Sequence, residues 1–126
     1  MEICENMKKL RSYLDEKKIK WIDQSEDMES ASIDMFICRT WLWLGDRKIS
    51  VVNGYGTYGG IHPMYNNGLK NRGLLEIQID GLGGVYGDLT SDDVIRIIKM
   101  IQESEDQRID ALFDRMNEIL ENDYEN

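Results

Sequence analysis

The segment Ser32–Val52, SIDMFICRTWLWLGDRKISVV, carries the strongest β-strand signal in the chain. Its first part, Ser32–Leu44, is the longest apolar run and is rich in Phe, Ile, Thr and Trp, which favour strands. Gly45–Arg47 is a turn signal and Lys48–Val52 continues as a second strand, so the segment predicts a β-hairpin. Both faces of the first strand are largely apolar, which predicts a central strand covered on both sides.

The segments around this hairpin predict further strands and terminal helices. Glu2–Lys18 places apolar residues at helical spacing opposite a charged face. Ile19–Asp23 and Leu74–Asp80 alternate apolar and polar residues as short strands do, and Gln24–Ser30 is a polar connection. After the N-cap and first-turn acids of Thr90–Asp93, two apolar stripes predict either one kinked helix or two helices.

Together these elements predict a single α+β domain over residues 1–126. Its core is an antiparallel sheet of four or five strands, with an N-terminal helix and one or two C-terminal helices packed against it. The last apolar stripe lies far from the strands in sequence. It packs either on the chain's own sheet or on another subunit, and we expect a homodimer or a higher homo-oligomer.

The composition narrows the class of protein. With 24 acidic and 15 basic residues, the net charge is −9, which makes direct nucleic-acid binding unfavourable because Lys and Arg must meet the phosphates. No apolar run approaches the roughly 20 residues of a membrane span. The start, MEICENMKKL, lacks the basic and apolar regions of a signal peptide. Cys4 and Cys38 are expected as reduced thiols, so a cytoplasmic protein is predicted.

Candidate catalytic and metal-binding groups are few. His62 is the sole histidine, and a zinc site needs more His and Cys ligands than the chain supplies. Glu76 and Asp80 would lie about 13 Å apart along a strand, too far for a glycosidase pair. We therefore expect no metal, no cofactor and no catalysis, with cleavage of a nucleotide as the less favoured alternative.

Charge is distributed unevenly along the chain. Met35–Leu75 contains five basic residues and one acidic residue, for a net charge of +4, whereas the remainder carries −13. The basic segment includes the glycine-rich sequence NGYGTYGG, Asn53–Gly60. This segregation indicates either a binding region for an anion or the lower acid content that strands have.

Asn53–Gly60 contains a literal G-x-G-x-x-G, but Pro63 and Asn66–Gly68 follow it instead of a helix, which excludes a dinucleotide-binding βαβ unit. Glycines let a ligand approach the backbone, and tyrosines offer a flat face and a hydroxyl. The loop therefore either binds a small anionic planar ligand, with the second glycine loop Gly81–Asp88 completing the pocket, or packs on itself at the sheet edge. The predicted ligand-binding residues are Arg47, Gly54, Tyr55, Gly56, Thr57, Tyr58, Gly59, Gly60, His62, Tyr65 and Arg72.

The motifs SVVNGYGTYGG, GLLEI and GDLTSDDV resemble an uncharacterised family of small accessory proteins carried by phages and prophages of Gram-positive bacteria. The resemblance covers Ile49–Val94, about a third of the chain, and assigns no functional residue. It implies a phage protein that acts in the host cytoplasm. Since small acidic phage proteins include many inhibitors of bacterial immunity, it also implies a counter-defence role.

Two functions follow as hypotheses. In the first, the protein binds and sequesters a small nucleotide-derived immune signal without catalysis, as the basic glycine-rich segment suggests. In the alternative, the acidic helices bind a host immune effector or nuclease and block its nucleic-acid site, as an anti-CRISPR protein does.

Overall fold

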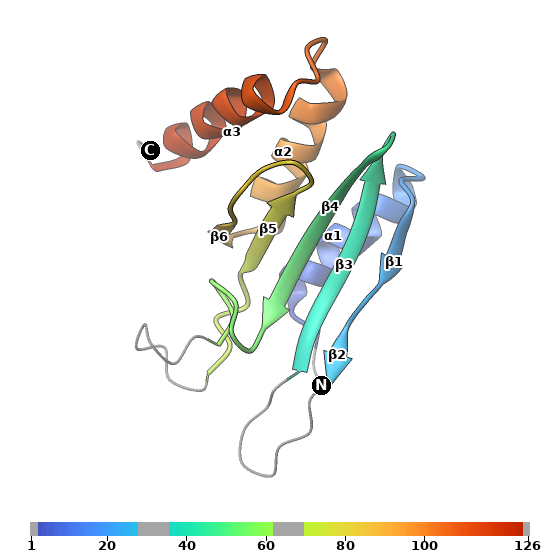
Figure 1. Cartoon of the computed structure of the whole chain (residues 1–126). Coiled ribbons are helices and arrows are strands. Elements are labelled where there is room, and N and C mark those ends of the chain that lie inside the picture. The colour runs from blue at the N-terminus through green and yellow to red at the C-terminus, as the bar shows by residue number, and fades with distance from the viewer. Residues whose placement is uncertain (1–2, 28–35, 62–69, 125–126) are drawn as a thin grey trace.

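The computed structural model describes residues 3–27, 36–61 and 70–124, without the side chains of 122–124, and has an α+β architecture (Figure 1). Helices α1 and α2 lie against one face of an antiparallel sheet, and α3 packs on α2. The elements are α1 (Glu5–Glu16), β1 (Trp21–Asp23), β2 (Glu26–Asp27), β3 (Phe36–Leu44), β4 (Arg47–Gly54), β5 (Leu75–Ile79), β6 (Tyr86–Leu89), α2 (Ser91–Glu103) and α3 (Ile109–Tyr124).

The sheet is an antiparallel meander in the order β1-β3-β4-β5-β6, and β2 pairs with the same edge of β3 as β1 does. The predicted hairpin is confirmed as β3 and β4. Leu44 pairs with Arg47, so Gly45 and Asp46 alone form the turn. Gly45 has a φ of +64°, which suits a two-residue hairpin turn.

The hydrophobic core lies between the sheet and helices α1 and α2. On β5, Leu75, Ile77 and Ile79 are buried, whereas Glu76 and Gln78 face away from the helices, as the alternation predicts. The α+β prediction is therefore confirmed. The helical side of the core contains Met7, Leu10, Leu14, Val94, Ile97, Ile98, Met100 and Ile101.

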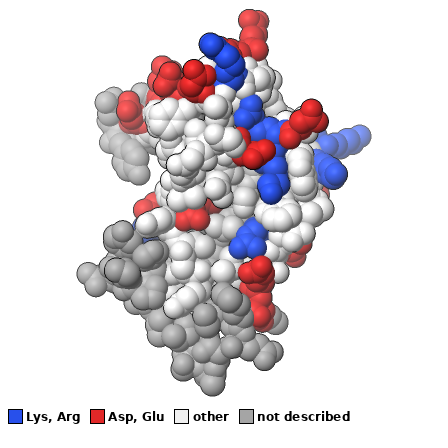
Figure 2. Space-filling model, viewed as in Figure 1, with Lys and Arg blue, Asp and Glu red and all other residues white. Residues whose placement is uncertain are grey.

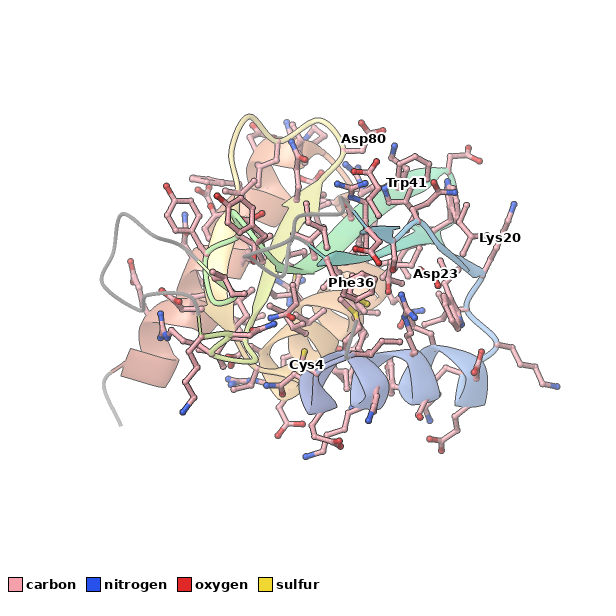
Figure 3. The ribbon with its side chains drawn as sticks, turned by 90° about the horizontal axis from the view of Figure 1, so that it is seen from below. Cys4, Lys20, Asp23, Phe36, Trp41 and Asp80 are labelled. Atoms are coloured by element: carbon pink, nitrogen blue, oxygen red, sulfur yellow. The ribbon has the colours of Figure 1, made fainter. Side chains whose placement is uncertain are left out.

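The prediction that β3 is covered on both sides is wrong for the part of the chain that the structure describes. Cys38, Thr40 and Leu42 are buried beneath the helices, whereas Trp41 and Trp43 are only half-buried on the other face. Figure 3 shows Trp41 on the side of the sheet opposite α1. Trp counts as apolar in a sequence pattern, but its large amphipathic ring can lie half-exposed on a sheet face that no described helix covers.

Two short strands were expected as connections. Glu26–Asp27 forms β2 within the predicted polar connection, and β6, Tyr86–Leu89, begins in the predicted loop Gly81–Asp88 and ends one residue beyond it. Neither has strand-favouring residues throughout, and in β6 Asp88 takes a φ of +58° beside a register shift. Backbone pairing with β3 and β5 imposes these strands against local propensity, so the sheet has six strands instead of four or five.

The C-terminal region consists of two helices, the second of the two predicted arrangements. Thr90 caps α2: its Oγ1 accepts the Asp93 N–H, and the Asp93 carboxylate accepts the Thr90 N–H, so the predicted N-cap is confirmed. Leu112 and Met116 of α3 are buried against their own chain. The last apolar stripe therefore packs on α2, and the homodimer stays a prediction.

Leu112→Ala should lower the free energy of unfolding by about 2–5 kcal/mol, because Leu112 is 1% exposed and its truncation leaves a cavity. Phe113→Ala is the matched control, since Phe113 is 39% exposed on the same helix. Its cost should be about 0.5–1.5 kcal/mol, the value of its aromatic contact with Tyr86. Urea unfolding measures both. A larger cost for Phe113→Ala that grows with protein concentration would contradict packing within one chain.

Candidate ligand site on the open face of the sheet

The face of the sheet away from α1 and α2, here called the open face, is hollowed along β4. Ser50 lies at the centre of this hollow and pairs with Trp41 on β3 and with Gln78 on β5. Side chains that face each other across paired strands are about 4.5–5.5 Å apart at Cβ. A small side chain between two large ones therefore leaves a depression, which we call the trough.

One end of the trough, the Trp41 lobe, has a volume of about 360 Å³. Trp41 and Lys48 line one side, and Asp80, Gly81 and Leu82 line the other. The Lys48 ammonium lies 4.2 Å from the centroid of the Trp41 ring, a cation–π contact. Figure 3 shows Trp41 and Asp80 on the same side of the sheet. This lobe thus combines a flat ring, a cation and a carboxylate.

The other end, the Tyr55 lobe, has a volume of about 260 Å³. The start of the first glycine loop, Tyr55–Thr57, forms its end wall, and Ile37, Val52 and Glu76 line its sides. Both predicted glycine loops therefore border the trough at opposite ends of β4. The two lobes share the lining residues Arg39, Ser50 and Gln78.

The two sides of the trough carry opposite charges. Arg39 on β3 and Lys48 on β4 supply positive charge, and Glu76 and Asp80 on the β5 side supply negative charge. Figure 2 shows Lys and Arg side chains gathered on this face over β3 and β4. Within the described residues, Lys48 makes no ion pair. An anion is therefore favoured at the β3–β4 side and hydrogen-bond donors at the β5 side.

Arg39 is held in place by strand β2 and its approach. Its Nη1 donates to the Gln24 carbonyl at 3.4 Å and lies 3.5 Å from the Glu26 carboxylate. Both contacts use Nη1, so among the described groups Nε and Nη2 keep their hydrogens for a ligand. The Arg39 side chain is 25% exposed, which strengthens its interaction with an anion relative to a fully solvated arginine.

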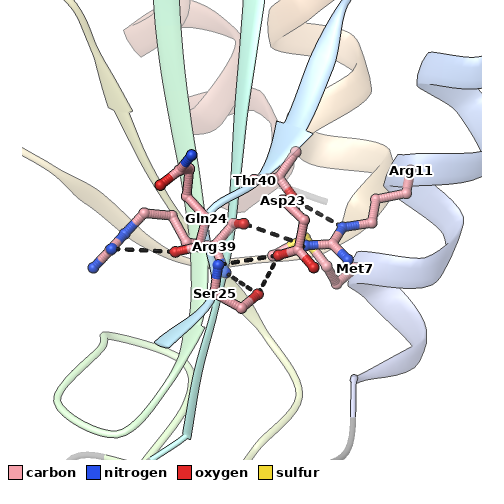
Figure 4. A network of polar contacts seen from close by, with 7 residues as sticks. All are labelled: Met7, Arg11, Asp23, Gln24, Ser25, Arg39 and Thr40. Atoms are coloured by element: carbon pink, nitrogen blue, oxygen red, sulfur yellow. Dashed lines mark hydrogen bonds and ion pairs between the residues drawn. The ribbon is translucent and has the colours of Figure 1, made fainter. Parts of the chain in front are cut away.

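The backbone of β3 at Arg39 and Thr40 is anchored by Arg11 of α1 (Figure 4). Arg11 Nε donates to Thr40 Oγ1 at 2.9 Å, and Nη2 donates to the Arg39 carbonyl at 3.2 Å and to Asp23 Oδ1 at 3.1 Å. Hydrogen bonds from Ser25 and the charge of Arg11 hold the pKa of Asp23 below its usual value. The anionic form of Asp23 thus completes a network that fixes the floor of the trough.

The first glycine loop is closed on itself by its backbone. Gly54 N–H donates to Thr57 Oγ1 at 3.0 Å, Gly56 N–H to the Ile61 carbonyl at 2.7 Å, and Tyr58 N–H to Glu76 Oε1 at 3.2 Å. These N–H groups are committed within the chain, unlike those of a phosphate-binding loop. The loop has the self-packed form that the sequence left open, and only Tyr55–Thr57 borders the trough.

Close packing explains several of the loop's glycines. A Cβ on Gly60 would collide with the Gly54 carbonyl, and a Cβ on Gly87 of β6 would collide with the Tyr58 side chain. Tyr58 therefore lies over β6, outside the trough lining, and Arg72 pairs with Asp88 at 2.9 Å. Of the three motif glycines, Gly54 and Gly59 also lack room for a Cβ, whereas Gly56 has room and is favoured by its φ of +80°.

Besides Tyr58 and Arg72, three further predicted site residues lie elsewhere or outside the described residues. His62 and Tyr65 lie outside the described residues. Arg47 begins β4, whereas Gly54 ends it, so the two are roughly 23 Å apart along an extended strand. The structure therefore does not bring Arg47 to the glycine loop. Instead, Arg47 donates to the carbonyls of Asp80 at 3.2 Å and Gln107 at 2.6 Å, which ties β4 to the α2–α3 connection.

The sequence-based set missed the residues at the centre of the trough. The signal was present, because strand alternation places Arg39 and Trp41 on one face of β3 and Lys48 and Ser50 on the matching face of β4. What could not be seen was that none of the helices the structure describes covers this face. Gln78 lies on β5, so its position beside Ser50 depends on the β4–β5 pairing, which the hairpin alone does not specify.

Other kinds of site find no support in the described residues. Those residues contain no group of three or more His, Cys, Asp or Glu able to hold a metal ion. Burial raises the pKa of both the Cys4 and the Cys38 thiols, which disfavours the nucleophilic thiolate. Of the helices that the structure describes, none combines the length and apolar character needed to cross a membrane.

Comparison of the chain with protein-family models, with curated proteins and with solved structures found no match.

Arg47→Ala should lower the free energy of unfolding by about 1–3 kcal/mol, because two carbonyl acceptors lose a charged donor. Arg108→Ala is the control: Arg108 is exposed, pairs with Asp106 two residues away, and should change stability by less than about 1 kcal/mol. Urea unfolding measures both variants. If Arg47→Ala instead leaves stability unchanged and abolishes ligand binding, Arg47 belongs to the binding site after all.

Proposed function

We propose that the protein binds a small anionic, nucleotide-derived ligand in the trough and holds it without chemical change. The supporting observation is the combination found along two adjacent hollows: two aromatic residues, Trp41 and Tyr55, two cations, Arg39 and Lys48, and acceptors on the opposite wall. A phosphate is met by the cations, and a base stacks on an aromatic ring. The hydroxyl and amino hydrogens of a nucleoside match Glu76 and its neighbours on β5.

A binding protein of this kind acts stoichiometrically and needs no catalytic group. Together with the resemblance to phage accessory proteins, this supports a counter-defence role in which the protein sequesters a nucleotide-derived immune signal in the host cytoplasm. The overall negative charge does not oppose such binding, because charges beyond about 8–10 Å are screened at physiological salt and Arg39 and Lys48 act at contact distance.

Trp41→Ala should weaken binding of the responding nucleotide by about 1–3 kcal/mol, since one stacking surface is removed. The matched control is Trp43→Ala. Trp43 lies two residues along β3 on the same face, under Lys20, and does not line the trough. A thermal-shift screen of mononucleotides, dinucleotides, cyclic nucleotides and ADP-ribose identifies the ligand, and calorimetry measures both variants.

Equal losses for Trp41→Ala and Trp43→Ala would place binding outside the trough. Absence of binding by every nucleotide in the screen would refute the proposed function. Lys48→Ala should also weaken binding, because Lys48 lies over the Trp41 ring. Lys99→Ala is its control and should not, because Lys99 lies over the Tyr13 ring, away from the open face.

A second candidate function is supported by α3. Four of its exposed residues are acidic and recur at spacings of four, four and three, which places them on one stripe of the helix: Asp110, Asp114, Glu118 and Glu121. A rigid acidic stripe complements the basic channel of a nuclease, as the anti-CRISPR-like alternative requires.

For this alternative, Asp114→Lys with Glu118→Lys should abolish protection of a phage against the nuclease-based defence that the natural protein neutralises. Glu103→Lys with Glu105→Lys is the control, because it makes the same change in net charge at exposed positions outside the stripe. Phage plating efficiency measures both. Equal effects of the two pairs would contradict a role for the stripe itself.

A further inference from the structure

We infer that the ligand of the trough is a dinucleotide, meaning two nucleosides joined through phosphate, and that each lobe holds one nucleoside; this inference rests on the proposed function. The two lobes of the trough are adjacent hollows that share the lining residues Arg39, Ser50 and Gln78. The shared region is where the two halves of such a ligand would be joined.

The size of the trough favours a ligand that occupies both lobes. The lobes have volumes of about 360 and 260 Å³, so each by itself is at or below the lower end of the range, roughly 300–1,000 Å³, found for ligand pockets. A ligand that occupies both adjacent lobes has both volumes available to it. A mononucleotide in one lobe would leave the aromatic wall of the other lobe in water.

The two lobes repeat the same chemistry. Each contains one aromatic side chain and one carboxylate: Trp41 with Asp80 in one lobe, and Tyr55 with Glu76 in the other. An aromatic ring accepts the face of a base, and a carboxylate accepts hydrogens from a ribose hydroxyl or an exocyclic amine. We assign one nucleoside subsite to each lobe; Lys48 lines only the Trp41 lobe, and Glu76 Oε1 of the Tyr55 lobe also accepts the Tyr58 N–H.

The cation between these subsites is Arg39. Arg39 pairs with Val52 in the sheet. The Ile37–Gly54 pair lies between Arg39 and the end wall at Tyr55, and the Trp41–Ser50 pair lies on the other side of Arg39. The Trp41 row and the Ile37 row are four residues apart on β3, about 13 Å. Arg39 Nη1 contacts Gln24 and Glu26 at the β2 edge of β3, and we assign its Nε and Nη2, which bond no described residue, as the donors to a linking phosphate.

Calorimetry with the full chain tests the inference. The probes are AMP and GMP, the linear dinucleotides pApA and pGpG, and the cyclic dinucleotides of the same bases. We expect at least one dinucleotide to bind roughly 5- to 150-fold more tightly than its own mononucleotide, the effect of one more stacked base. Trp41→Ala and Tyr55→Ala should each remove most of that gain. Trp43→Ala and Tyr58→Ala, which change aromatic residues outside the trough lining, should not.

Ser50→Phe supplies a test that removes no contact. A phenyl ring at the junction blocks a ligand that crosses it, and Phe is favoured in a strand, so the variant should fold and lose dinucleotide binding at least tenfold. If mononucleotides bind as tightly as dinucleotides, or if only one of Trp41 and Tyr55 matters, the inference is wrong and the proposed function stands. If no nucleotide of either length binds, the proposed function fails and the inference with it.

Discussion

The hydrogen bonds of the Arg11 guanidinium join helix α1 to the sheet, and the arrangement of the sheet's two faces depends on them. The Arg11 side chain is only 12% exposed, and it contacts Thr40, the Arg39 carbonyl and Asp23, with the Trp21 ring 5.0 Å from its carbon Cζ. A cation that is mostly removed from water must have its hydrogens accepted, or it destabilises the fold. Its hydrogen bonds join helix α1 to strands β1 and β3, and strand alternation places the Arg39 side chain on the open face when Thr40 faces Arg11.

The open face is a consequence of how the apolar surface is distributed. The three helices have enough apolar residues to cover one side of the sheet and each other, and α3 packs on α2 instead of crossing to the far side. Trp41 and Trp43 then remain partly in water, each with a lysine above its ring at 4.2 and 4.9 Å. A surface of this kind, with flat rings, cations beside them and a small residue at its centre, is suited to a flat anionic ligand.

The glycine loops contribute shape more than contacts. In the first loop, the donors that a phosphate would need are already used by Thr57, Ile61 and Glu76. The loop is therefore a rigid wall at one end of the trough, and the start of the second loop borders the other end. At Gly54, Gly59, Gly60 and Gly87 a Cβ would collide with neighbouring atoms, which is a packing requirement, whereas Gly45, Gly56, Gly73 and Gly81 are favoured by their positive φ.

Local patterns were sufficient to predict the hairpin, the half-buried strand β5, the cap of α2 at Thr90 and the α+β class, because each depends on residues close together in the sequence. They also placed Tyr55–Thr57 at a candidate site. They could not place Arg47, since a residue near the loop in sequence is a full strand length from it in space. Nor could they show that Ser50 lies between Trp41 and Gln78, or that no described helix covers them. Those facts depend on which strands pair and on which face the helices bury, and such long-range choices are made by the packing of the whole domain.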